Sequence, residues 1–318
     1  MAVVSIAKLR LCRRCGIIVG NANMIEANKL NGSRKKRKGS VRLTLGVIII
    51  LALLAALELR DSSVNLEVSE YEISSERLPE SFDGFRIVQL SDLHGARFGE
   101  DGNELAETVR ALKPDLIALT GDFITDGSDL DAVRELVPRL TELCPVYFVS
   151  GNHEFGSGLA QEVRKIVEDA GARYLSNEFV TVSRGGESIL LGGVEDPLAY
   201  ADMIDPPELA RLMNEADAAA YKILLGHRNY WMTKYPELPV DLIFSGHAHG
   251  GLVRIPGVGG LIGTDRKLFP RYTAGVFENG SYTLVVSRGL GNSVPVPRLF
   301  NRPEIVAVTL HNQGIFSP

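Results

Sequence analysis

The stretch Gly246-His247-Ala248-His249-Gly250-Gly251 decides how the rest of this chain is interpreted. It follows the apolar run Val240–Ser245, which predicts a short buried strand. Two imidazoles that leave a strand and enter a glycine turn can both present ring nitrogens to one cleft. Imidazole is a common ligand of zinc and iron near neutral pH. A His-x-His pair alone fits a metal site and an ordinary loop equally well.

The positions of the other histidines favour a shared site. Five of the six histidines stand at the ends of apolar, strand-like runs, beside Asp, Asn or Gly: His94, His153, His227, His247 and His249. Chance placement would scatter them over helices and surface loops. The pattern therefore indicates that several strand ends contribute to one cleft.

Composition describes an ordinary globular protein. The chain has 318 residues, 45% of them hydrophobic, and a formal net charge of −5, which gives no reason to expect a nucleic-acid partner. The three cysteines are Cys12, Cys15 and Cys144, and only the last lies in the part that is expected to fold. The main domain therefore has no disulfide framework. Cys12-x-x-Cys15 lacks a second Cys or His pair nearby, so we do not interpret it as a zinc or redox site.

A membrane anchor is expected near the N-terminus. The basic run Arg34–Lys38 precedes Leu43–Leu57, which carries no charge. That apolar run has about 15 residues, against the roughly 20 usual for a spanning helix, although Arg42 could lengthen it by snorkelling. A buried core helix is the alternative, but a basic flank before an apolar core is typical of a signal peptide or signal anchor. No clean cleavage motif follows.

We therefore expect an uncleaved, single-pass anchor in the cell membrane, with the N-terminus in the cytoplasm and the C-terminal domain outside it. The predicted division is an N-terminal basic, disordered segment (1–40), a signal-anchor helix (41–60) and one domain (61–318).

The domain alternates strands with helices and then changes to hairpins. Strands are predicted at 64–73, 85–90, 116–119 and 146–149, and helices around 103–112, 130–140 and 159–170. Hairpins are predicted around Gly185-Gly186, between 179 and 191, and around Asn279-Gly280, between 272 and 286. The sequence thus predicts a mixed α/β (α+β) domain.

Polar residues follow five apolar runs: Asp92-x-His94, Gly121-Asp122, Gly151-Asn152-His153-Glu154, Gly226-His227 and the opening stretch. Open α/β sheets bind ligands at the carboxyl ends of their strands. A single loop Asp or Asn often serves only as a turn former or helix cap, but five such loops favour a site. Carboxylate, imidazole and amide ligands suit two divalent cations, Mn, Fe or Zn. Such a pair can clamp a phosphate ester and lower the pKa of a water molecule.

These motifs, in this order, resemble those of the calcineurin-like metallophosphoesterases, and the resemblance covers about residues 82–311. The segments 269–275, 287–292 and 301–305 resemble a bacterial branch of membrane-anchored or exported phosphodiesterases. The resemblance implies the metallo-dependent phosphatase fold, in which two facing mixed β-sheets are flanked by helices (an αββα sandwich).

The resemblance also implies roles for residues. One metal would be held by Asp92, His94 and His249, and the other by Asn152, His227 and His247, with Asp122 bridging both. His153 would face the substrate phosphate and help the leaving group depart rather than bind metal. Glu154 would make loop hydrogen bonds. Two departures from the family pattern, Arg228-Asn229 after His227 and Leu252 after the last motif, concern substrate contacts rather than metals.

The predicted function is hydrolysis of a phosphodiester or pyrophosphate bond with two divalent metals, with a lipid head group as one possible substrate. The alternatives are an inactive envelope-binding protein of the same fold, and a phosphodiesterase acting on cell-wall polymer or nucleotide. Inactive relatives usually lose a ligand, whereas every ligand position is filled here. Candidate phosphate-binding cations are Arg254, Arg266, Lys267, Arg271 and Arg288, each of which also fits an ordinary solvated surface.

Overall fold

The computed structural model describes residues 20–197, 219–264 and 266–316. Contacts divide the chain into two compact units, residues 1–56 and 57–318. Helix α1 (Gly20–Val64) starts within the segment predicted to be disordered and ends beyond the predicted anchor. Its part Arg42–Val64 has a mean hydropathy of 2.3 and is long and apolar enough to cross a membrane. No other helix in the described ranges meets these criteria.

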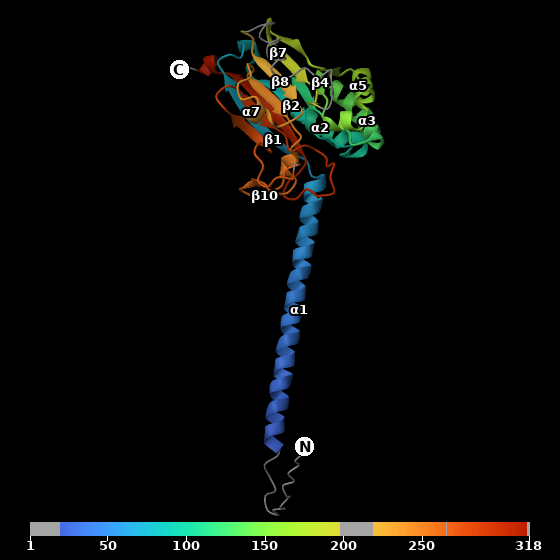
Figure 1. The fold of residues 1–318 in the computed structure, drawn as a ribbon, viewed down its shortest axis with the longest axis vertical. Helices are drawn as coiled ribbons and strands as arrows, with labels where there is room; N and C mark the ends of the chain where they lie inside the picture. Colours follow the sequence, from blue (N-terminus) through green and yellow to red (C-terminus); the bar gives the residue numbers. More distant parts are fainter. Residues whose placement is uncertain (1–19, 198–218, 265, 317–318) are drawn as a thin grey trace, which may run out of the picture. The chain divides into compact units, whose positions relative to one another are not determined.

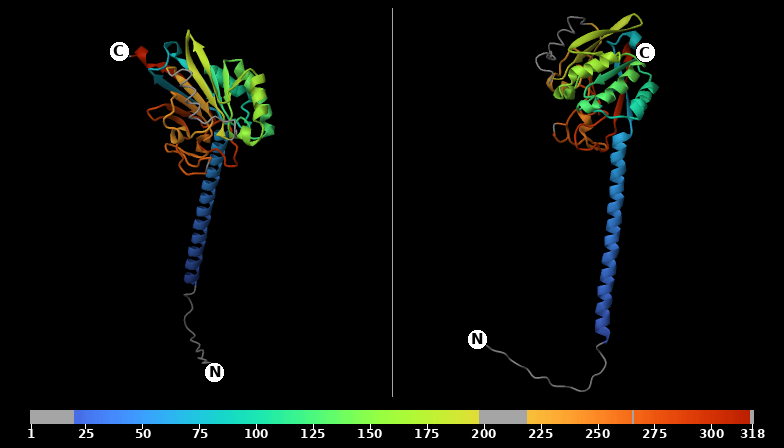
Figure 2. Two further views of the ribbon diagram at one scale, coloured as in Figure 1. Left: turned by 45° about the horizontal axis from the view of Figure 1, so that its top comes forward. Right: turned by 90° about the vertical axis from the view of Figure 1, so that its right-hand side faces the viewer.

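The second unit contains two six-stranded mixed sheets (Figures 1 and 2). The first sheet has the order β1-β14-β2-β3-β4-β5. Its strands are β1 (Glu67–Ser75), β2 (Phe85–Leu90), β3 (Leu116–Thr120), β4 (Val146–Val149), β5 (Arg173–Tyr174) and β14 (Glu304–Asn312). Strands β2, β3, β4 and β5 run parallel to one another, and β14 pairs antiparallel with β2.

The second sheet has the order β12-β13-β9-β8-β7-β6. Its strands are β6 (Glu178–Arg184), β7 (Glu187–Val194), β8 (Lys222–Gly226), β9 (Leu242–Ser245), β12 (Gly275–Glu278) and β13 (Thr283–Val286). Both predicted hairpins are confirmed, because β6 pairs antiparallel with β7 and β12 with β13. The remaining two strands, β10 (Arg254–Ile255) and β11 (Gly259–Gly260), form a small separate sheet.

Helices α2 (Asn103–Ala111), α3 (Leu130–Thr141) and α5 (Ala160–Asp169) agree with the three predicted ones to within two residues. Two short helices follow strand ends, α4 (Asn152–Gly156) after β4 and α7 (Trp231–Lys234) after β8. Single 3-10 turns cover 80–82, 100–102, 127–129, 249–251 and 313–316. The strand predicted from Tyr272 begins only at Gly275, because Tyr272 has a φ of 54°, which is incompatible with a strand.

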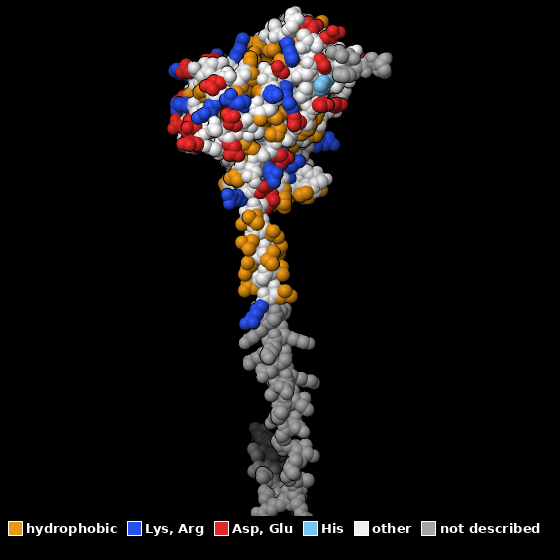
Figure 3. All heavy atoms as spheres, turned by 180° about the vertical axis from the view of Figure 1, so that it is seen from behind, with side chains coloured by type: hydrophobic (Ala, Val, Ile, Leu, Met, Phe, Trp, Pro, Cys, Tyr) orange, Lys and Arg blue, Asp and Glu red, His pale blue; other side chains and the backbone are white. Residues whose placement is uncertain are grey.

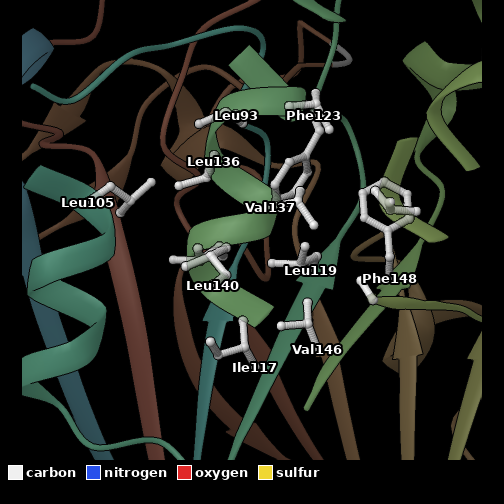
Figure 4. Close-up of a cluster of buried hydrophobic side chains, with 14 of the residues drawn as sticks. Leu93, Leu105, Ile117, Leu119, Phe123, Leu136, Val137, Leu140, Val146 and Phe148 are labelled. Carbon is white, nitrogen blue, oxygen red and sulfur yellow. The ribbon is translucent and has the colours of Figure 1, made fainter. Parts of the chain in front are cut away.

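Strand residues alternate between two cores, as they must when both faces of a sheet are covered. Leu116 and Ala118 of β3 point into a core between the two sheets, together with Ile223 and Phe244 of the second sheet. Ile117 and Leu119 point to the opposite face, where α2 and α3 cover the sheet. Figure 4 shows Leu105 of α2 and Leu136, Val137 and Leu140 of α3 against these strands. A third core packs Trp231 and Met232 of α7 against the outer face of the second sheet.

These layers give the order helix, sheet, sheet, helix, so the predicted αββα sandwich is confirmed. Because the parallel strands of both sheets end at one edge, the loops that follow them come together there.

Candidate active site

The predicted site residues follow the ends of strands in both sheets. Asp92 and His94 follow β2, Asp122 follows β3, and Asn152 and His153 begin α4 after β4. His227 follows β8, and His247 and His249 follow β9. Backbone hydrogen bonds join the neighbouring loops, from Asp92 N to Gly121 O over 2.9 Å and from Gly246 N to His227 O over 2.9 Å. The site is therefore built where the two sheets face each other.

The first cluster consists of Asp92, His94 and His249, whose ligand atoms all lie within 4.8 Å of one another. His94 Nε2 lies 3.2 Å from His249 Nε2, and His249 Nε2 lies 3.4 Å from Asp92 Oδ1. All three residues are buried. The two ring nitrogens and the carboxylate thus converge on one point, as ligands of one cation do.

The second cluster consists of Asp122, His227 and His247, again with ligand atoms within 4.8 Å of one another. His227 Nε2 lies 3.0 Å from Asp122 Oδ2 and 3.2 Å from His247 Nδ1. Asp122 Oδ2 also lies 3.9 Å from His94 Nε2 of the first cluster. Asp122 is therefore the residue that the two clusters share, which is the place that a bridging carboxylate occupies.

Burial keeps most of these imidazoles uncharged. It lowers the pKa of His94 to about 4, lowers that of His247 to about 2, and lowers that of His249 well below its usual value. Burial opposes protonation of His227 as well, but the adjacent Asp122 carboxylate raises its pKa to about 10. Burial also raises the pKa of Asp92 to about 6. Imidazole nitrogens and carboxylate oxygens gathered within 4.8 Å of one another are a donor set that suits a divalent cation.

Asn152 supports the same conclusion. Its side-chain oxygen Oδ1 is buried and has no hydrogen-bond partner among the described residues, and neither does His249 Nδ1. Buried polar atoms without partners are rare in folded proteins and call for an explanation such as an ion. The residues present therefore fit divalent cations.

The backbone at the site is strained. Five of the predicted ligands have a positive φ: Asp92 (51°), His94 (47°), Asp122 (56°), His247 (66°) and His249 (47°). A non-glycine residue in this region carries a strain of roughly 1–3 kcal/mol. Such strain persists where the surrounding structure fixes the backbone, and here it turns ligand side chains from adjacent loops toward one cleft.

Two glycines allow the loops to approach this closely. A Cβ atom on Gly246 would overlap Ser91 Oγ and Asp92 Oδ2, and one on Gly151 would overlap Asp122 Oδ1. Because Gly246 has no side chain, the backbone N–H of His247 reaches Asp92, at 3.0 Å from Oδ1 and 3.1 Å from Oδ2. The glycines of the motifs are thus required for contact between the loops.

Glu154 holds the loop after β3. Its fully buried carboxylate accepts hydrogen bonds from the backbone N–H groups of Gly151 (2.7 Å), Asp122 (3.0 Å) and Phe123 (2.7 Å). The interpretation of Glu154 as a loop hydrogen-bonding residue is confirmed. Burial, followed by the nearby Asp122 charge, raises its pKa to about 7.

His153 forms a further group with His94 and Asp122, in which the ligand atoms lie within 4.8 Å of one another. Its backbone N–H donates to Asp122 Oδ1 over 2.8 Å, and its ring meets that of His94 edge to face, with centroids 4.8 Å apart. His153 is only partly buried.

Comparison with known proteins identifies the family of the chain. Residues 85–251 match the family model described as calcineurin-like phosphoesterase. The chain belongs to this family. It is 32% identical over 259 residues to an uncharacterized metallophosphoesterase of Aquifex aeolicus, covering 78% of this chain and 93% of that protein. It is 30% identical over 251 residues to the uncharacterized metallophosphoesterase YkuE of Bacillus subtilis, covering 77% and 85%.

A further relative is the phosphodiesterase YaeI of Escherichia coli, 29% identical over 234 residues, covering 71% of this chain and 82% of that protein. The predicted family and fold are thus confirmed. As a calcineurin-like phosphoesterase, the chain is a hydrolase of phosphoric esters in a family that uses two metal ions, and its clusters can hold metal.

Beside the metal clusters the phosphoesterase has a basic cavity of about 360 Å³, lined in part by His247, Arg228, Lys267 and Arg271. Arg228 Nη1 lies 3.0 Å from His247 Nε2, and Arg228 Nη2 donates to Asp196 Oδ1 over 3.1 Å. Arg228 is one of the departures noted in the sequence. Its guanidinium, held by a buried carboxylate, brings a positive charge to the edge of the site.

Three residues that support the site could not be predicted from the sequence. Arg298 is buried and donates to the backbone carbonyls of Gly291 and Arg288, and Asn301 is buried behind His249. Asp196 orients Arg228. Asn301 lies in the segment 301–305, which the sequence marks only by its resemblance to the family, and nothing in the sequence near Arg298 or Asp196 indicates these contacts. Arg288, a candidate for phosphate binding, instead pairs with Glu304 and Glu67.

Proposed function

We propose that this chain is a membrane-anchored phosphoesterase that uses two divalent metals to hydrolyse a phosphodiester or pyrophosphate bond in the head group of a lipid. The observation that carries the proposal is the gathering of Asp and His ligand atoms into groups that could hold metal, two of which contain Asp122. The proposed anchor is the apolar part of α1, with a single crossing and the enzyme domain outside the cytoplasm.

The proposed ligand sets follow the two clusters. Asp92, His94 and His249 would hold one ion, and Asn152, His227 and His247 the other, with Asp122 between them. Manganese, iron or zinc suits these nitrogen and oxygen ligands. The ions would neutralise charge on the phosphate oxygens and supply a nucleophile from water at neutral pH. Glu154 and the strained backbone keep the ligands in place before substrate binds.

His153 is the proposed general acid. A departing alkoxide needs a proton, and an imidazolium at hydrogen-bond distance can donate one. His153 is the histidine of the site that is partly exposed and has no assigned ligand role. Its backbone bond to Asp122 Oδ1 holds it next to the proposed bridging carboxylate.

Two observations support a lipid head group as substrate. The basic cavity beside His247 offers Arg228, Lys267 and Arg271 to an anion near the reacting phosphate. A second phosphate of a pyrophosphate would be such an anion. The apolar part of α1 would also keep the domain close to bilayer lipids.

The chemistry is tested by hydrolysis of bis(4-nitrophenyl) phosphate by the purified full chain with added Mn²⁺. We expect turnover that a chelator abolishes and Mn²⁺ restores. An inactive envelope-binding protein would show none under either condition. Incubation with a lipid extract, followed by mass spectrometry, then tests the substrate class. Loss of phosphorylated lipids is expected, and an unchanged extract with turnover of nucleotides or cell-wall polymer would refute the lipid assignment.

A further inference from the structure

The exposed apolar side chains of the domain are gathered in one part of the sequence. Among the residues beyond α1 whose side-chain exposure the structure describes, every exposed bulky apolar side chain falls between residues 255 and 300. These residues, which we call the apolar rim, are Ile255, Val258, Leu268, Phe269, Val294, Val296 and Phe300. Val258 is 67% exposed, Leu268 66% and Phe269 58%. Monomeric soluble proteins scatter such residues singly, and a gathering of them marks an interaction surface.

Backbone hydrogen bonds join the segments that carry the rim. Leu261 N donates to Val253 O over 2.8 Å, and Phe269 N donates to Leu261 O over 2.9 Å. Arg254 N donates to Leu299 O over 2.9 Å, which connects these two segments to the one that carries Phe300. The rim is therefore one part of the surface although its residues come from three loops. Figure 3 shows apolar (orange), basic (blue) and acidic (red) side chains together on the part of the domain next to the last turns of α1.

The loop that carries Phe300 of the rim is hydrogen-bonded to the last turns of α1. Phe300 N donates to Glu58 Oε1 over 2.9 Å, and Asn301 N donates to Ser62 Oγ over 3.2 Å. Arg302 forms an ion pair with Asp61 over 2.6 Å. Glu58 is the first charged residue after the apolar run of α1. The loop that carries Phe300 is thus fixed where the apolar helix ends, which in an anchored protein is the membrane–water interface.

The basic residues next to the rim also suit a position at the membrane–water interface. Arg266 and Lys267 directly precede Leu268 and Phe269, and Arg271 follows them closely, all three exposed. Apolar side chains next to Lys and Arg are the composition of segments that lie in a bilayer interface, where basic residues meet anionic head groups.

We propose that the apolar rim inserts into the surface of a bilayer that contains anionic phospholipids, as a second membrane contact beside α1. The inference rests on the proposed membrane anchoring. Two neighbouring cavities share Pro270, Arg271 and Tyr272, and one of them extends to His247. Val258 and Phe269 of the rim line one cavity and His247 lines the other, so the rim and the proposed metal site border adjoining cavities.

The test uses full-length variants reconstituted in vesicles of phosphatidylcholine and phosphatidylglycerol, with or without dibrominated phosphatidylcholine, which quenches tryptophan on contact. Phe269→Trp and Val258→Trp place the probe on the rim. The native Trp231 is buried and gives a constant background. Ser188→Trp is the control, because Ser188 is exposed in the β6–β7 hairpin. That hairpin contacts Ser81 and Asp115, at the opposite ends of the strands from the site.

We expect at least twofold stronger quenching of both rim probes than of the control. Equal quenching in chains that float with the vesicles would overturn the rim contact and leave the anchor intact. Chains that do not float would overturn both. Rim emission that depends on protein concentration and not on bromolipid would indicate self-association and also overturn the inference. Turnover of bis(4-nitrophenyl) phosphate by the unaltered chain in the same vesicles tests the proposed chemistry separately, and circular dichroism checks that each variant is folded.

Discussion

The side-chain amide of Asn301 donates hydrogen bonds to the backbone carbonyls of His249, over 2.8 Å, and Leu252, over 2.9 Å. Asn301 also donates its own N–H to Ser62 Oγ near the end of α1. A single buried residue therefore connects the loop of His249, a proposed metal ligand, to the last turns of α1. Because His249 is held in a strained backbone conformation, these bonds help to fix the direction of its ring.

Replacing this amide should destabilise the domain and weaken metal binding. Asn301→Asp has the same shape but puts acceptor oxygens against two buried carbonyls. A buried polar group left without its partner costs about 1–3 kcal/mol. We expect a lower urea midpoint and a weaker affinity for Mn²⁺ in titrations. Asn279→Asp is the control, since Asn279 is exposed in the β12–β13 turn. Equal effects of both substitutions would contradict the role of Asn301.

Removing the carboxylate of Asp122 should reduce the number of metal ions that the chain binds. Asp122→Ala is expected to lose at least one of two metals per chain, as measured by elemental analysis, together with activity on bis(4-nitrophenyl) phosphate. Asp126→Ala is the matched control, because Asp126 is an exposed cap of the 127–129 turn. A fully active protein that binds no more than one metal tightly, even in excess Mn²⁺, would rule out the dimetal assignment.

The role of His153 can be separated from those of the ligands. His153→Ala should keep both metals and lose most activity on alkyl phosphodiesters, whose leaving groups need a proton. Loss of a general acid typically costs about 10²–10⁴-fold. On a nitrophenyl ester, whose leaving group departs unprotonated, the loss should be clearly smaller.

His311→Ala serves as the control, because His311 pairs with Asp83 and lies in strand β14, outside the loops that carry the proposed ligands. Equal losses on the two ester types would argue against the acid role of His153, and loss of a metal would make it a ligand.

The position of a truncation should determine the stability of the soluble domain. A chain starting at Leu57 keeps Glu58, Asp61 and Ser62, whereas one starting at Asn65 loses their bonds to residues 300–302. The exposed Asp61–Arg302 pair contributes little, and each of the other two bonds about 0.5–1.5 kcal/mol. Thermal unfolding of the shorter chain should therefore occur several degrees lower, since 1 kcal/mol shifts Tm by about 2–4 °C in a domain of this size. Identical Tm values would show that these bonds contribute nothing.

Protease accessibility tests the proposed orientation. If α1 crosses the membrane with its basic flank inside, protease added to intact cells or protoplasts should digest the domain. The fusion of a cytoplasmic reporter to the N-terminus provides the internal control, since it should stay protected. Digestion of the domain only after lysis would reverse the orientation.

Much of the fold could be predicted because strand and helix signals are local. The strands β2, β3 and β4 and the helices between them follow from apolar runs and periodic patterns that neighbouring residues supply. Strand β14 was not predicted. It lies between β1 and β2, parallel to one and antiparallel to the other, although more than two hundred residues separate it from them. Such pairing depends on which edges remain free after the rest of the sheet has formed.

Some features of the candidate site could likewise be predicted from the sequence, and others could not. The sequence by itself determined the residue types at the strand ends and their glycine neighbours, because a turn after a buried strand needs them within a few positions. That His94 and His249 share a site with Asp122 between the two groups was implied only by the family resemblance. The tertiary structure brings His94 and His249, 155 positions apart, to within 3.2 Å of each other. Only the tertiary structure decided that Asn301 supports a ligand loop and that three separate loops form one apolar rim. These relationships depend on the packing of two sheets against each other, which brings distant segments together and leaves no periodic signal in the chain.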